Sequence, residues 1–333
     1  MRKLLLLTGF LVVCVTGLSQ NLPFDTSDAT HIQRTNLTVR WKAPKHPWPK
    51  TLWIYKVVPT HFSPSVISNL MALEPFTEQP KRDYGANGFL IGNLNGSHPN
   101  LRVSFVAGDI EYNGTDRHYS ATNLTKDVPA TNHLFELTTN FLQKFGISPS
   151  EVAKRENGQP KIGWYASDHT EYSTDKGIVT NVEYRTVWVA RALDGVDYPG
   201  PDTDCRISFG EQGKVVKIWM HWHSVEREKQ YMAASAENIS QWIREGRAIQ
   251  RPIVKSPGSP ETVVDWSTVK SLTITKAKAN YFGDSLDRQM AHKPLSSSRV
   301  RPDAWLSGIV DTGKEKLNLE IICPIIDESK PLN

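Results

Sequence analysis

Two histidines one residue apart form the only group of side chains in this sequence with the spacing of a metal site. His221 and His223 flank Trp222, and Glu226 follows three residues after His223. Residues two apart on an extended strand point to the same face, so both imidazoles could bind one zinc ion. A third ligand is required, and the sequence does not identify it. The alternative interpretation is a solvated polar strand end, so a metal-dependent hydrolase is a candidate function but not the preferred one.

A pair of carboxylates could supply acid–base chemistry. Asp168 and Glu171 follow Trp164 and Tyr165, a combination found in glycosidases, which need two carboxylates at a defined separation. The segment Gly163–Gly177 is polar, however, and we expect it to form an exposed loop. No nucleophile motif and no glycine-rich phosphate loop occurs. The sequence therefore predicts no catalytic residue and no cofactor, and it favours a protein that is not an enzyme without deciding the point.

Three consecutive strands are expected to carry these polar side chains. The strand Ile178–Arg191 is followed by a hairpin over residues 204–222, which turns at Gly210–Gly213. Period-two alternation predicts that one face of the hairpin is buried, formed by Cys205, Ile207, Phe209, Val216, Ile218, Met220 and Trp222. The opposite face is the predicted binding face, formed by Glu183, Arg185, Arg206, Lys217 and Trp219, with His221 beside them.

Two cysteines, Cys205 and Cys323, lie outside the first twenty residues. Each belongs to a strand-like run with apolar neighbours. In an oxidising compartment they could form one disulfide. Two separately buried thiols are an equally good interpretation, and the sequence leaves the choice open.

Helices and antiparallel strands occur in groups along the chain. We expect a helix that begins at Pro64 after a Ser63 cap, another over Val128–Phe145, and a third that starts near Ala236. Each is followed by several strands rather than by one parallel strand. This order predicts an α+β fold, with antiparallel sheets and helices packed on one face. Because the order occurs about twice, two similar units are a further hypothesis.

The start of the chain resembles a secretory signal peptide. A basic Met1-Arg2-Lys3 precedes the apolar run Leu4–Val15, and small residues lead to an expected cleavage between Ser19 and Gln20. We therefore expect a secreted or periplasmic protein. The expected organisation is a signal peptide at 1–19, a loosely ordered lead-in at 20–50, a helix-plus-sheet unit at 51–126, a second unit at 127–249, a linker at 250–264 and C-terminal strands at 265–333.

Charge and hydropathy exclude some partners. Loss of Arg2 and Lys3 with the signal peptide lowers the formal net charge from +4 to +2, and the remaining basic residues are scattered. We therefore expect no nucleic-acid partner. No later apolar run approaches the ~20 residues that a membrane-spanning helix needs, so we expect no membrane span after signal cleavage.

Ten tryptophans are a high number for this length. Exposed aromatic rings bind sugars and peptides, although tryptophans more often cap cores or cover sheet edges. Carbohydrate binding through residues such as Trp48 and Trp219 is therefore an alternative function.

The stretch from Val182 through Arg247 resembles the PepSY-like domains of extracytoplasmic bacterial proteins. The resemblance depends on Tyr184, on the crossing Arg191–Gly200, on Ile207–Gly210 and on the turn Gln212–Val215. It implies a helix packed on an antiparallel sheet, no catalytic residues, and regulation or inhibition of another protein. The sequence therefore favours a secreted, non-enzymatic protein that binds an extracytoplasmic protein or peptide through the face described above.

Overall fold

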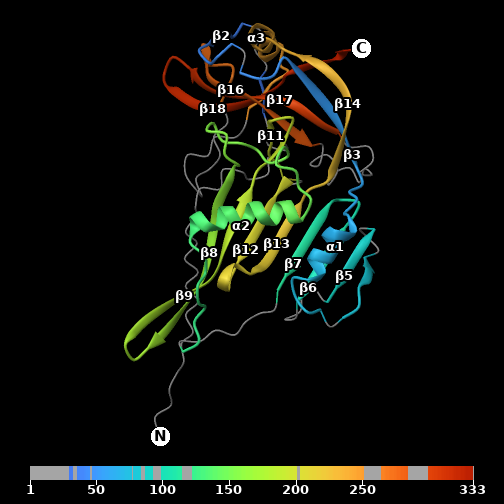
Figure 1. Ribbon diagram of the computed structural model, residues 1–333. Helices are drawn as coiled ribbons and strands as arrows, with labels where there is room; N and C mark the ends of the chain where they lie inside the picture. The colour runs from blue at the N-terminus through green and yellow to red at the C-terminus, as the bar shows by residue number, and fades with distance from the viewer. Residues whose placement is uncertain are drawn as a thin grey trace.

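The computed structural model describes residues 30–32, 36–45, 47–76, 78–83, 87–92, 99–114, 122–200, 203–250, 264–283 and 299–332. The expected signal peptide lies outside these residues, as does the expected linker apart from its two end residues. Strands make up 52% of the described residues and helices 14%. The described chain forms two large sheets and three α-helices, and the two sheets lie one above the other in Figure 1.

The predicted α+β fold is wrong, because the described protein is mostly β. The three expected helices do form, but they are short. Residues 163–174, which the sequence indicated as loop, belong instead to a strand of 13 residues. Strand propensity is weak evidence at such polar positions, since pairing with neighbouring strands decides the outcome.

The first sheet has eight strands, and every neighbouring pair in it is antiparallel. In spatial order its strands are β4 (Lys81–Asp83), β5 (Gly88–Ile91), β6 (Asn100–Ser104), β7 (Asp109–Asn113), β13 (Val215–His221), β12 (Cys205–Phe209), β9 (Gly177–Val189) and β8 (Ile162–Thr174). A short 3₁₀ turn, η3 (Glu211–Gly213), joins β12 to β13.

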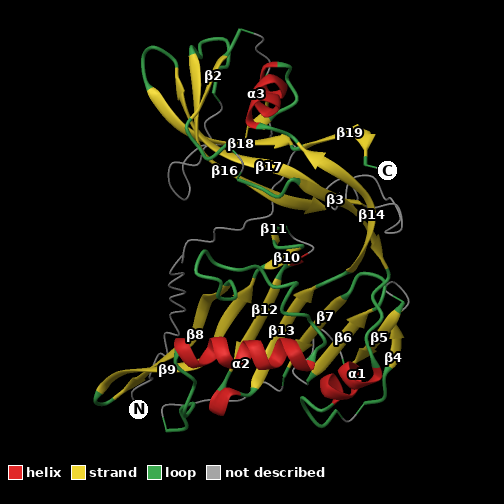
Figure 2. Ribbon diagram, turned by 45° about the horizontal axis from the view of Figure 1, so that its top comes forward, coloured by secondary structure: helices red, strands yellow, loops and turns green. Residues whose placement is uncertain are grey.

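Two helices cover one face of this sheet (Figure 2). The first is α1 (Pro64–Met71), which is capped by the Ser63 side chain as expected and buries Val66 and Leu70. The second is α2 (Thr131–Lys144), which buries Leu134 and Phe141 against the sheet. The predicted buried side of the 204–222 hairpin is confirmed, since all of its residues except the half-buried Val216 lie in this core.

The second sheet has eleven strands and is branched. One path runs through β1 (Thr30–His31), β15 (Ile249–Gln250), β18 (Lys316–Pro324), β17 (Arg299–Asp311), β16 (Ser271–Gly283), β11 (Val196–Tyr198) and β10 (Arg191–Leu193). The strands off this path are β2 (Thr38–Trp41), β3 (Thr51–Val58), β14 (Ser224–Ala233) and β19 (Ile326–Pro331).

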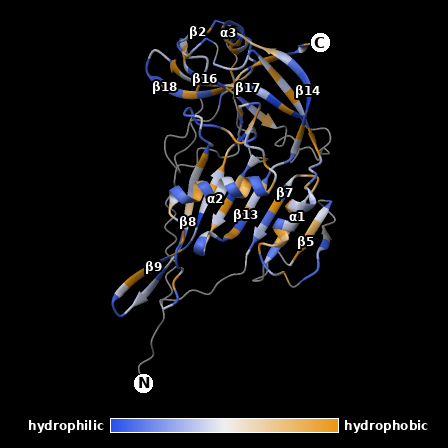
Figure 3. Cartoon of the chain, viewed as in Figure 1, coloured by the Kyte–Doolittle hydropathy of each residue, from blue (hydrophilic) through white to orange (hydrophobic). Residues whose placement is uncertain are grey.

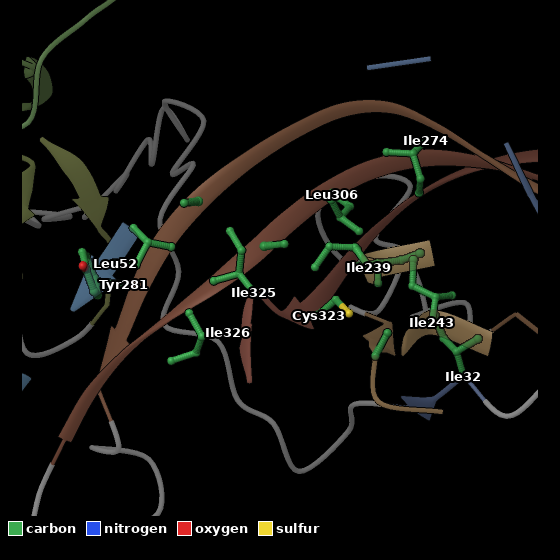
Figure 4. Packing of buried hydrophobic residues seen from close by; sticks show 14 of the residues in the cluster. Ile32, Leu52, Ile239, Ile243, Ile274, Tyr281, Leu306, Cys323, Ile325 and Ile326 are labelled. Carbon is green, nitrogen blue, oxygen red and sulfur yellow. The ribbon is translucent and has the colours of Figure 1, made fainter. Parts of the chain in front are cut away.

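A separate core lies on the second sheet. The helix α3 (Ala236–Arg244) begins with a capping box at Ser235 and contributes Ile239 and Ile243 to this core. Figure 4 shows these two side chains beside Cys323 and Leu306 of the sheet. Burial of such aliphatic side chains contributes about 1.5–3 kcal/mol each, so α3 is held by packing more than by its own propensity.

The chain passes repeatedly between the two sheets. Strands from both expected units, 51–126 and 127–249, join in the eight-stranded sheet, while β3 and β14 from the same two ranges pair in the other. The two sheets therefore do not follow consecutive stretches of sequence. At the passage from β13 to β14, the backbone nitrogen of Ser224 donates to Oγ1 of Thr60 at 2.8 Å, and Gly108 packs against His223.

A hairpin extends away from the eight-stranded sheet. It consists of the far halves of β8 and β9, and it projects beyond the sheet in Figures 1 and 2. The expectation of a loop over Gly163–Gly177 is wrong, because β8 occupies 162–174 and turns at Asp175-Lys176 into β9. Figure 3 shows hydrophobic and hydrophilic residues mixed along the hairpin.

Candidate functional site

The candidate site is the face of the eight-stranded sheet opposite α1 and α2. Strand register places one side chain from each central strand in a row across it, in the order Glu111, Trp219, Arg206, Trp188. Neighbouring strands lie about 4.8 Å apart, so these side chains adjoin one another. We call this surface the open face, and its central residues are Glu111, Tyr165, Tyr184, Trp188, Arg206, Lys217 and Trp219.

Aromatic rings occupy much of the open face. Trp219 is 46% exposed and Tyr165 is 41% exposed, which is unusual for such large side chains. Trp188 lies against the backbone of β8 at Gly163, where a Cβ atom would be only 2.3 Å from the indole Nε1. Glycine at this position therefore leaves the room in which the indole lies across the neighbouring strand.

Two cations are held over tyrosine rings. The guanidinium of Arg206 lies 4.5 Å from the ring centroid of Tyr165, donates to the Tyr165 hydroxyl at 3.0 Å and pairs with Asp204. The ammonium of Lys217 lies 4.5 Å from the ring centroid of Tyr184 and donates to its hydroxyl at 2.7 Å. These contacts hold flexible cationic side chains in place, so less side-chain entropy would be lost on binding.

A histidine–carboxylate pair lies at one end of the open face. Nδ1 of His221 and Oδ1 of Asp109 are 2.7 Å apart, and the imidazole meets the Trp219 indole edge-on at a centroid distance of 5.3 Å. At the other side of the face, Asp168 accepts a hydrogen bond from the Tyr184 hydroxyl. The open face thus combines aromatic rings with charges of both signs.

The structure brings together only part of the predicted binding face. Arg206, Lys217 and Trp219 share the open face, and Glu183 is the extra residue of a β-bulge in β9, but Arg185 lies on the opposite side of the sheet. Arg185 is paired across the strands with the buried Phe209, and its guanidinium donates to the carbonyl oxygens of residues 128 and 129 just before α2. Glu183 accepts a hydrogen bond from the Thr170 hydroxyl.

The sequence pattern predicts the wrong inner face for β9, and this error has a simple cause. A binding face that includes Arg185 puts Thr186 and Trp188 on the inner face by alternation, whereas Val187 and Val189 are the residues that fill the core. In a strand with large side chains on both faces, alternation alone does not say which face is buried. The same alternation puts Tyr184 and Trp188 on the wrong face, and the predicted binding face did not include Tyr165. A possible signal was the Gly163–Trp188 pair, since a strand glycine often accommodates an aromatic neighbour.

The two histidines of the candidate metal site are not together. β13 ends at His221, so the period-two rule does not extend to His223. His223 is buried between the sheets, where its Nε2 lies 3.1 Å from the Tyr198 hydroxyl, whereas His221 pairs with Asp109. Among the residues that the structure describes, no group of three or more His, Cys, Asp or Glu side chains could hold a metal ion.

Both cysteines are free and buried, so the structure has the second of the two arrangements left open by the sequence. Cys205 lies in the core of the eight-stranded sheet and Cys323 in the core of the other. Burial raises the pKa of both thiols well above its usual value. Such thiols are protonated and unreactive at neutral pH.

Trp48, the other tryptophan considered for carbohydrate binding, does not present an exposed ring. Trp48 is half-buried, donates from Nε1 to the carbonyl oxygen of Ala234 at 3.1 Å, and meets the edge of Trp41 at a centroid distance of 6.3 Å. Its role is to pack the lead-in segment against the second core.

No protein-family model matches the chain, and no significant match is found among curated proteins. The PepSY-like resemblance therefore stays a prediction. Among the described residues, no helix is long and apolar enough to cross a membrane.

Proposed function

We propose that this chain is an extracytoplasmic binding protein that recognises a protein or peptide through the open face. The proposal rests above all on one observation, the exposed Trp219 at the centre of a row with Arg206 and Trp188. Tryptophan, tyrosine and arginine are the residues that dominate binding energy at protein interfaces. Both helices of this sheet pack on its other face, so these side chains remain accessible among the described residues.

The character of the face favours a polypeptide ligand. Charges of both signs alternate with aromatic rings, as in the succession Glu111, Trp219, Arg206. An arrangement of this kind selects a partner with complementary charges and apolar side chains. The proposed export of the chain through its N-terminal signal would place such a partner outside the cytoplasm.

Peptide selection tests the proposal directly. A phage-displayed random peptide library is selected against the immobilised chain from Gln20 onward, and enriched peptides are then titrated in solution. We expect Trp219→Ala and Arg206→Ala each to weaken binding at least tenfold. The matched control is Met232→Ser, which removes a side chain that is 55% exposed on the second sheet, and it should leave binding unchanged.

Two results would overturn the proposal. One is selection without enrichment over an unrelated immobilised protein. The other is enriched peptides that bind both open-face variants as tightly as the unaltered chain. Carbohydrate binding has a specific observation in its favour, the accessible Trp219 ring. A glycan array is therefore probed in parallel. A signal on the array that Trp219→Ala abolishes would indicate that the ligand is a sugar and not a peptide.

A further inference from the structure

The projecting hairpin is a two-stranded ribbon for much of its length. The third strand, β12, pairs with β9 only from Arg185 onward, so residues 168–184 form the ribbon. Near the base of this ribbon, the backbone nitrogen of Thr125 donates a hydrogen bond to Oδ1 of Asn181 at 2.7 Å. Two strands alone are marginally stable in water, whereas three or more strands are independently stable. The ribbon would therefore gain stability from further strands.

One edge of the ribbon is available for such pairing. Among the strands described, β8 pairs only with β9. The pairing of β8 with β9 contains two bulges. The extra residue of the first is Tyr165, on β8, and the extra residue of the second is Glu183, on β9. β8 is thus regular from Ala166 to Thr174, and that stretch has no proline and no lysine. Bulges, prolines and charged side chains, lysine above all, are the features by which edge strands usually avoid pairing with other chains, and this stretch carries only two carboxylates of that kind, Asp168 and Glu171.

The sequence of this edge is complementary to itself. In an antiparallel pair of two identical β8 strands, a twofold axis at Tyr172 pairs Thr170 with the partner's Thr174. Glu171 then lies opposite the partner's Ser173, so no like charges face each other along the paired stretch. The same register brings the turn residue Asp175 beside the partner's His169.

We propose that two copies of this chain associate through the outer edge of β8, with Tyr172 at the twofold axis, so that the two ribbons form one four-stranded sheet. Pairing of identical edges is isologous and closes after two copies, which limits further growth. Because the ribbon projects from the body in Figures 1 and 2, the two bodies stay apart while the ribbons pair.

Cysteine cross-linking tests this arrangement on the chain from Gln20 onward. Cys205 and Cys323 are buried, so a cysteine introduced on the ribbon is the accessible thiol of the described chain. Under mild oxidation, Tyr172→Cys should give a disulfide-linked dimer in most molecules. Ile178→Cys is the matched control, because Ile178 is 70% exposed on β9 of the same ribbon but lies away from the axis, and it should cross-link at least tenfold more slowly.

Sedimentation velocity supplies a second measurement that does not need a disulfide. The unaltered chain should sediment as a dimer whose dissociation constant rises about tenfold with Ser173→Glu, which faces the partner's Glu171. Ser173→Lys should instead leave it unchanged or lower it. A monomer at every concentration tested would overturn the proposal. Equal cross-linking at positions 172 and 178, or equal effects of the two charges at 173, would overturn this register and symmetry.

Discussion

The substitution Gly108→Ala tests how closely the two sheets are joined. Gly108 lies in the turn before β7 with a φ of 69°, and the chain segment that leads from β13 to β14 passes directly over it. A Cβ atom there would be 2.6 Å from Cα of His223 and 2.6 Å from Oγ1 of Thr60. Thr60 itself holds Ser224 across the junction, so neither neighbour can move without disturbing the passage between the sheets.

Two costs add at this position. The left-handed conformation costs an alanine about 1–2 kcal/mol. Forcing a methyl group against fixed backbone costs a further ~1–3 kcal/mol, as overpacked sites do. We therefore expect Gly108→Ala to lower the free energy of unfolding by about 2–5 kcal/mol. The matched control is Gly158→Ala, because Gly158 has a φ of 81° with no atom within 4 Å of the added Cβ. Only the conformational cost of about 1–2 kcal/mol applies there.

Urea unfolding followed by far-UV circular dichroism measures both variants against the unaltered chain, with midpoints and slopes compared. The reasoning requires the two destabilisations to differ by at least about 1 kcal/mol. Equal losses would show that the backbone at the junction yields to a methyl group, and the close approach at Gly108 would then have no structural importance.

Three further predictions concern buried residues of the two cores. Ile218→Ala, at a buried core position, should cost about 2–5 kcal/mol, whereas Lys217→Ala, at an exposed position, should cost less than about 0.5 kcal/mol. The reverse order would mean that β13 has its other face inward. Ellman's reagent should react with neither Cys205 nor Cys323 in the folded chain and with both after unfolding without reductant, since both are free and buried; no reaction after unfolding would indicate a disulfide. Burial raises the pKa of Tyr281 from 10.0 to about 12, so its contribution to stability is complete below pH 10 and is lost as the pH rises to about 12; in urea unfolding at several pH values, Tyr281→Phe should make the alkaline loss of stability less steep.

Sequence patterns correctly predicted the elements that have one buried face and one solvent-exposed face. The hairpin of β12 and β13 alternates except at the bulge that makes Val216 an extra residue, and the structure confirms Cys205, Ile207, Phe209, Ile218 and Met220 on its inner side. The helix start at Pro64 was predicted from the Ser63 cap, which acts locally, so it did not depend on the rest of the fold.

The sequence-based predictions failed where the burial of a strand depends on pairing with strands that are distant in the sequence. β8 has no apolar alternation over Ser167–Thr174, because both faces of the ribbon meet solvent, so a polar loop was the natural interpretation of its sequence. The face of β9 depends on its pairing with β12, which places Val187 opposite Ile207. The His221–His223 pair failed for a third reason, since the strand ends between the two residues and the rule of alternation ends with it.

The two proposed surfaces share β8 and β9 but are separable along these strands. The row that contains Trp188 and Arg206 lies where β9 is paired on both sides, by β8 and β12, and is part of the rigid sheet. Tyr172 lies in the part of the ribbon that β12 does not reach. Changes more than about 10 Å apart with no shared partner add independently. Trp219→Ala should therefore leave the sedimentation of the chain unchanged, and Ser173→Glu should leave the affinity of each open face for a selected peptide unchanged, although a dimer would display two such faces to a multivalent ligand. If Trp219→Ala dissociated the dimer, the open face would itself be the contact between copies, and both the peptide proposal and the β8 edge proposal would be replaced by that single interface.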